Sequence, residues 1–219
     1  MKTYTIRRAD GDVPLGETVA GTPWVKADTV YIDEFSWHDE GPKPATQGHV
    51  LYDDRALFLQ FFAEDDEIHA ETTELNGPTY ADSSVEFFAA PGGDRYFNFE
   101  ANCCGQFKLA WQEPGWQVHG QRELISPELA SRIDVRTSVP GSTKEPAPGD
   151  DGWWLAAAIP FSVLSELTGR EIGPETGTEW RGNVYRSGVP DPRKATWNPI
   201  EEPEPAYHSP EYFGRLRFE

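Results

Sequence analysis

The stretch YADSSVEFFAA at 80–90, followed by PGGD at 91–94 and RYFNFEAN at 95–102, decides the fold. Both outer segments alternate their side chains with the period of two that is typical of β-strands. The four residues between them are turn formers. The stretch therefore predicts a β-hairpin.

The alternation predicts two unlike faces for this hairpin. The apolar side chains share one face, which we expect to pack in a core: Val85, Phe87, Ala89, Phe97, Phe99 and Ala101. The register must place both Phe sets on the same side, because a slip of one residue would drive Glu86 into the core. The other face carries carboxylates, carboxamides and rings: Ser84, Glu86, Phe88, Tyr96, Asn98, Glu100 and Asn102. We interpret this second face as a binding surface.

Length and composition favour one all-β domain. The chain has 219 residues, and its 20 glycines and 19 prolines are spread along it, as in proteins with many short strands. Further strands are predicted at 4–8, 47–52, 56–64, 106–111, 133–139, 153–159, 180–186 and 212–218, and short helical turns at 126–129 and 160–167. Because no βαβ alternation occurs, we expect a single antiparallel β-sandwich (jelly-roll or immunoglobulin-like). It would have about ten strands over residues 1–219, with 1–21 as a first strand and a lead-in.

The segment 187–210 is the least regular part of the sequence. It carries six prolines and no clear period, and it holds Trp197 and Tyr207. A structureless stretch of this length is usually either a functional loop or disordered. The two aromatic residues argue against disorder.

The net charge, the apolar runs and the cysteines of the sequence limit which partners and which cellular compartment we expect. Acidic residues outnumber Lys and Arg by 37 to 19, a net charge of −18, so neither nucleic acid nor an anionic membrane is expected as a partner. No apolar signal core follows Met1, and the longest nearly apolar run, 153–164, is too short for a bilayer span of ~20 residues. The only cysteines, Cys103 and Cys104, are adjacent, which fits a reducing compartment. We expect a cytoplasmic protein, or an extracellular one if a leader has been removed.

Common catalytic and metal motifs are missing from the sequence. It has no nucleophile elbow, Walker loop, dinucleotide-binding glycine motif or zinc-ligand spacing. No cofactor is expected, and calcium stays open at Asp53-Asp54 and at 64–67, although neither has the spacing of a calcium loop. Glu86 and Glu100 suit either a glycosidase acid and base or acceptors for ligand hydroxyls. The second role needs no tuned pKa and is preferred.

Four groups of residues occur in a fixed order along the chain. They are YDDxxLF at 52–58, GPxYxDSxVEFF at 77–88, YFNFExN at 96–102, and WNP at 197–199 before FGxLxF at 213–218. Together they resemble the family 9 carbohydrate-binding modules, in their stand-alone bacterial branch, which is related to DOMON-like sandwiches. The resemblance covers about residues 22–219 and implies a β-sandwich that binds sugar.

This resemblance implies a non-catalytic site in which two facing aromatic rings hold a mono- or oligosaccharide. Tyr80 and Trp197 match the two ring positions, and Glu86 matches the acidic residue after the first ring. Polar contacts to the sugar are assigned to Asn98, Glu100, Asn102, Arg186 and Asn198. Replacement of Trp197 by alanine is then expected to abolish glycan binding and to leave the melting temperature nearly unchanged.

Two other functions stay open at this point. DOMON-like sandwiches bind haem, and because Met1 is the only methionine, a haem iron here would need a histidine pair. A carbohydrate-processing enzyme would instead use Glu86 and Glu100. An absorption spectrum and a turnover assay separate these functions from plain binding.

Overall fold

The computed structural model describes residues 1–145, 147, 149–188 and 193–219. Within this part of the chain the strands are β1 (Thr3–Arg8), β2 (Thr29–Tyr31), β3 (Thr46–Tyr52), β4 (Ala56–Ala63), β5 (Ser84–Ala90), β6 (Tyr96–Asn102), β7 (Phe107–Gln112), β8 (Arg122–Leu124), β9 (Asp134–Thr137), β10 (Trp153–Pro160), β11 (Glu179–Ser187), β12 (Ala195–Thr196) and β13 (Gly214–Phe218). The α-helices are α1 (Trp116–His119), α2 (Pro127–Ala130) and α3 (Phe161–Thr168), and short 3-10 turns are η1 (Pro23–Lys26), η2 (Thr79–Ala81) and η3 (Pro210–Tyr212).

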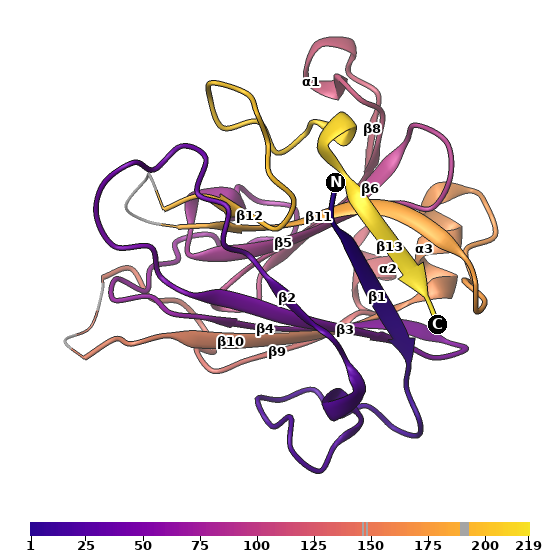
Figure 1. The fold of residues 1–219 in the computed structure, drawn as a ribbon, viewed down its shortest axis with the longest axis horizontal. Coiled ribbons are helices and arrows are strands. Elements are labelled where there is room, and N and C mark those ends of the chain that lie inside the picture. The colour runs from indigo at the N-terminus through magenta and orange to yellow at the C-terminus, as the bar shows by residue number, and fades with distance from the viewer. Residues whose placement is uncertain (146, 148, 189–192) are drawn as a thin grey trace.

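The strands form one curled, mixed sheet that folds into two facing layers (Figure 1). One layer has the order β8-β7-β6-β5-β11-β13, and the other has the order β3-β4-β10-β9 with β2 beside β3. Strand β1 joins the layers, because residues 3–6 pair in parallel with β13 and residues 7–8 pair in parallel with β3. The other strand pairs are antiparallel.

The predicted all-β, two-layer architecture is confirmed, with differences in detail. The described residues contain thirteen strands rather than about ten. The two layers are also joined through the parallel pairs of β1, which local alternation cannot reveal because they link distant parts of the chain. The predicted helical turns correspond to α2 and α3, whereas α1 was not predicted. Four residues of the Pro-rich segment, 189–192, lie outside the described part of the chain.

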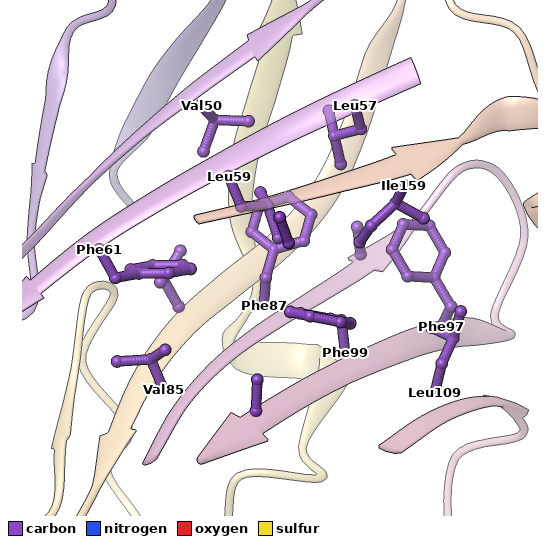
Figure 2. Close-up of a cluster of buried hydrophobic side chains, with 14 of the residues drawn as sticks. Val50, Leu57, Leu59, Phe61, Val85, Phe87, Phe97, Phe99, Leu109 and Ile159 are labelled. Carbon is purple, nitrogen blue, oxygen red and sulfur yellow. The ribbon is translucent and has the colours of Figure 1, made fainter. Parts of the chain in front are cut away.

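The core lies between the two layers (Figure 2). Side chains of β3 and β4, such as Val50, Leu59 and Phe61, meet Phe87 of β5 and Phe99 of β6 in one buried cluster. In the β5–β6 pair Phe87 lies opposite Phe99 and Glu86 opposite Glu100, so the predicted register of the hairpin is confirmed. Glu86 and Glu100 consequently face away from this core.

The outer face of each layer is partly covered by an irregular segment. Trp24 of η1 is fully buried against Leu51 and Phe58 of the β3–β4 layer. On the other layer, residues 200–213 cover β5, β6 and β11 through a second cluster that includes Phe88, Tyr96, Tyr185, Tyr207 and Phe213. No helix in the described residues is long and apolar enough to span a bilayer.

Candidate functional site

The floor of the candidate site is a pair of carboxyl groups on β5 and β6. Glu86 and Glu100 are directly opposed in the antiparallel register, and their exposed fractions are 1 % and 2 %. Both belong to the outward set of the hairpin, so the segment that covers the layer encloses them from above. Buried carboxyl groups require partners.

Glu100 has three partners in the surrounding elements. Lys108 of β7, at the opposed register position, forms an ion pair with Glu100 Oε2 at 3.0 Å. Thr79 Oγ1 donates to the same oxygen at 3.3 Å, and Asn98 Nδ2 donates to Oε1 at 2.8 Å. The Lys108 ammonium also lies 5.2 Å from the centre of the Tyr80 ring, within the range of a cation–π contact. Glu100 thus links the floor of the site to its most exposed ring.

Glu86 has a different environment. Ser187 Oγ of β11 donates to Glu86 Oε1 at 2.9 Å. Burial raises the pKa of the Glu86 carboxyl well above its ordinary value, and the neighbouring Glu100 carboxylate raises it further. The Glu86 carboxyl therefore favours its protonated form. In that form it can donate one hydrogen bond to a ligand hydroxyl and accept others.

Replacement of Glu86 by glutamine is expected to stabilise the protein increasingly as the pH rises. Because the folded pKa is raised, the wild type is most stable, relative to the variant, below the unfolded-state pKa of about 4.3, and loses stability as the pH rises towards the folded pKa. The glutamine variant has no such loss. Urea unfolding between pH 4 and pH 9 measures the difference, with the exposed Glu171→Gln as control. A stability difference that does not change with pH would contradict the assigned shift.

Aromatic rings surround the carboxyl pair. Tyr80 in η2 is 56 % exposed, whereas Trp116 of α1 is half-buried. The Arg122 guanidinium lies 4.1 Å from the centre of the Trp116 ring, and the His208 ring meets it edge-on at 5.4 Å. These contacts hold the indole in place beside the carboxyl pair. Figure 1 shows α1 and the covering segment on the same side of the layer.

His208 is an uncharged part of this wall. Its ring stacks on Phe88 at 5.1 Å, and Nδ1 lies 3.0 Å from both Tyr96 Oη and Gln112 Nε2. Burial lowers the pKa of His208 to about 3, and the positive charges of Arg122 and Lys108 lower it further. The imidazole is therefore neutral at physiological pH.

These residues enclose a pocket of about 300 Å³. Its lining comes from η2, β5, β6, α1, the end of β11, the residue before β12 and the covering segment: Tyr80, Glu86, Glu100, Trp116, Gln117, Ser187, Lys194, Pro205, Tyr207 and His208. The structure thus brings together Tyr80, Glu86 and Glu100 as predicted. Trp116, Tyr207 and His208 were not predicted as site residues. In the sequence, the signal for Trp116 is its place directly after a Pro-Gly turn. The signal for Tyr207 and His208 is the Pro-rich segment in which they lie.

Two predicted polar residues of β6 lie outside this pocket lining. Asn98 donates to Glu100, so it positions a carboxylate of the floor. Asn102 donates to Thr72 O and Asp82 Oδ2 at 3.0 and 2.8 Å, and its Oδ1 accepts from two backbone N–H groups of the following turn. Asn102 therefore stabilises the turn at the end of β6.

Arg186 and Asn198 also have structural partners. Arg186 is 1 % exposed and reaches across to the other layer, where it donates to Thr46 Oγ1 and Glu64 O. Asn198 donates to Tyr212 O at 2.7 Å and accepts from the backbone N–H of Lys2 at 2.7 Å. Neither residue lines the pocket beside Tyr80.

The structure does not place Trp197 in the pocket, which corrects the expectation of an exposed ring. Its side chain is 5 % exposed and belongs to the main core, edge-on to Tyr4 at 6.3 Å. The register explains this, because Thr196 pairs with Tyr185, and the N–H of Trp197 donates to Val184 O at 2.8 Å. Trp197 therefore continues the ladder opposite Val184, a core residue, and points to the same face.

The acidic runs considered for calcium have other partners. Asp53 Oδ1 accepts from the backbone N–H groups of Arg55 and Ala56, which closes the β3–β4 turn. Asp65 and Asp66 form ion pairs with Arg193. In the part of the chain that the structure describes, no group of three or more His, Cys, Asp or Glu side chains is arranged to hold a metal ion.

Sequence comparison decides the family. Residues 23–218 match the profile of carbohydrate-binding family 9. The chain belongs to this family. The resemblance predicted from the four motifs is therefore confirmed, and the family 9 match spans both layers and the pocket. None of the curated proteins matches the chain.

Solved structures of similar fold include the three chains that follow. A candidate carbohydrate-binding protein from Bacteroides uniformis is 27 % identical, with a TM-score of 0.86 over 100 % of this chain and 99 % of that one. A family 9 module from Caldicellulosiruptor kristjanssonii in complex with glucose is 14 % identical, with a TM-score of 0.62 over 100 % and 96 %. The cellotriose complex of a family 9 module from the same organism is 13 % identical, with a TM-score of 0.63 over 100 % and 94 %. The last two share the fold of this chain.

Proposed function

We propose that this protein binds a neutral pyranose sugar, without turnover, in the pocket between Tyr80 and Trp116. The observation that carries the proposal is the combination of aromatic rings with an enclosed carboxyl pair, Glu86 and Glu100, on one outer face of the sheet. Family 9 membership supports sugar as the ligand class. Family 9 modules of similar fold hold glucose and cellotriose, which makes these two sugars the first probes.

The chemistry of a pyranose fits this arrangement. A pyranose ring has apolar C–H faces, which aromatic side chains bury, and a rim of hydroxyl groups, which carboxyl and hydroxyl side chains bind. A protonated Glu86 and an ionised Glu100 would offer both a donor and acceptors to that rim. The Glu100 carboxylate and the net charge of −18 disfavour uronic acids and sulfated glycans.

Binding is favoured over hydrolysis by the partners of Glu100. Directly opposed residues have Cβ atoms about 4.5–5.5 Å apart, so spacing alone does not separate a binding pair from a retaining glycosidase pair at about 5 Å. Lys108, Thr79 and Asn98 together donate to both oxygens of Glu100, which lowers the nucleophilicity of this carboxylate. We therefore expect no release of reducing sugar from a panel of oligosaccharides.

Replacement of Tyr80 or Trp116 by alanine is expected to weaken glucose binding by about 5-fold to 150-fold. Removing one stacked aromatic ring from a bound sugar costs on the order of 1–3 kcal/mol. Titration calorimetry with glucose measures the change, and Tyr31→Ala is a matched control, because Tyr31 of β2 is 57 % exposed and belongs to the other layer. Unchanged binding in both pocket variants would contradict the proposed site, and a glycan array of the wild type tests the sugar class.

A further inference from the structure

A second pocket adjoins the sugar pocket on the same face of the molecule. It has a volume of about 400 Å³ and lies between residues 36–39 on one side and Lys194 and residues 203–205 on the other. Lys194 and Pro205 line both pockets, so the two spaces share a wall rather than lying on separate surfaces. Neither Tyr80 nor the carboxyl pair lines the second pocket.

The aromatic surface continues from one pocket into the other. Tyr207, which lines the first pocket, stacks on Tyr185 at 4.3 Å with an interplanar angle of 15°. The Trp37 ring, which lines the second pocket, lies 5.9 Å from the Tyr207 ring at an interplanar angle of 46°. Trp37 Nε1 donates to Glu202 O at 2.8 Å, so the indole is fixed before any ligand arrives. A fixed, half-buried ring loses little side-chain entropy when a ligand stacks on it.

The rim of the second pocket is polar. Ser36, Asp39 and Glu204 are exposed, and Lys194 lies half-buried at the shared wall. These groups supply hydrogen-bond acceptors and donors to hydroxyl groups in several directions. The second pocket therefore combines an aromatic ring with a polar rim, as the first pocket does.

We propose that the two pockets form one groove, and that the ligand is an oligosaccharide of at least two linked sugar units rather than a single sugar. The second unit would stack on Trp37 and place its hydroxyl groups against Asp39 and Glu204. This inference rests on the proposed function of the first pocket. It gives the second pocket the role of selecting an oligosaccharide over a single sugar.

Calorimetry with glucose and cellotriose on the same protein tests the proposal. The wild type is expected to bind cellotriose about tenfold or more tightly than glucose, because only cellotriose reaches the second pocket. Trp37→Ala should lower the affinity for cellotriose to that for glucose and leave glucose binding unchanged. Trp37→Phe keeps a stacking ring and should retain most of the preference. Trp154→Ala, which removes a half-buried Trp from the other layer, should behave as the wild type.

Each result decides between the proposals. Equal affinity of the wild type for the two sugars would overturn the second pocket as a sugar subsite and leave the first pocket standing. The same conclusion follows if Trp37→Ala and Trp37→Phe weaken both sugars alike while their melting curves match the wild type. Tyr80→Ala should weaken both sugars, which distinguishes the first pocket from the second. Failure of both sugars to bind the wild type would overturn both proposals.

Discussion

Replacement of Trp197 by alanine is expected to lower the free energy of unfolding by about 3–5 kcal/mol, the usual range for removal of a buried Trp side chain. The indole is 5 % exposed and lies in the core between β1 and β11. It also packs closely against Gly214, where an added Cβ would lie 2.6 Å from its Cζ3 atom. Because the residues around Gly214 are already tightly packed, they can move little to fill the cavity that the indole leaves.

Thermal and urea unfolding measure the effect of Trp197→Ala. A domain of this size loses roughly 2–4 °C of melting temperature for each kcal/mol. Trp154→Ala is the matched control, because its side chain is only half-buried and we expect it to change stability far less. At temperatures where the Trp197 variant stays folded, glucose binding should persist. A stable variant that has lost glucose binding would restore Trp197 to the site and contradict its placement in the core.

Replacement of Arg186 by methionine is expected to destabilise the protein by about 3–5 kcal/mol, because it breaks a buried ion pair on one side only. Arg186 Nη2 lies 3.6 Å from Asp65 Oδ2, and neither side chain is more than 2 % exposed. The same guanidinium donates to Thr46 Oγ1 and Glu64 O, both at 2.9 Å. The variant would leave the Asp65 carboxylate buried with fewer donors and would uncouple β11 from the opposite layer.

A double-mutant cycle separates this ion pair from general loss of packing. Removal of both Arg186 and Asp65 should cost less than the sum of the two single changes, since the double variant leaves no unpaired buried charge. Arg132→Met is the surface control, because its pair with Glu166 at 2.6 Å is largely exposed and should contribute about 0–1 kcal/mol. Strict additivity of the Arg186 and Asp65 changes would contradict the coupling.

The sequence predicted the floor of the site because that floor follows local rules. Alternation along β5 and β6, with turn residues between them, fixes which side chains share a face, and it correctly placed Glu86 beside Glu100. Tyr80 was assigned through the family resemblance, because it occupies a ring position of the motif at 77–88, which leads into the same hairpin. The core strands were predicted from alternation as well, since their apolar sets repeat every second residue.

The walls of the site could not be predicted because they depend on contacts between distant segments. Trp116 is in a four-residue helix within a loop, where no period shows which way it points. Trp197 was mistaken for a loop residue, because the two-residue strand β12 is too short to show alternation, and only its pairing with β11 reveals the inward direction. Asn102, Arg186 and Asn198 are polar residues whose partners are contributed by other elements.

The position of β13 has a consequence for how the chain reaches its native state. β13 fills the space between β11 and β1, so until residues 214–218 arrive, both neighbours present open rows of backbone N–H and C=O groups. Such unpaired edges are templates for association with other chains. Because β1 lies at residues 3–8, this closure is among the most non-local contacts in the protein and is expected to form slowly. A nascent chain therefore carries two unpaired strand edges until β13 has been synthesised, and aggregation competes with folding during that interval.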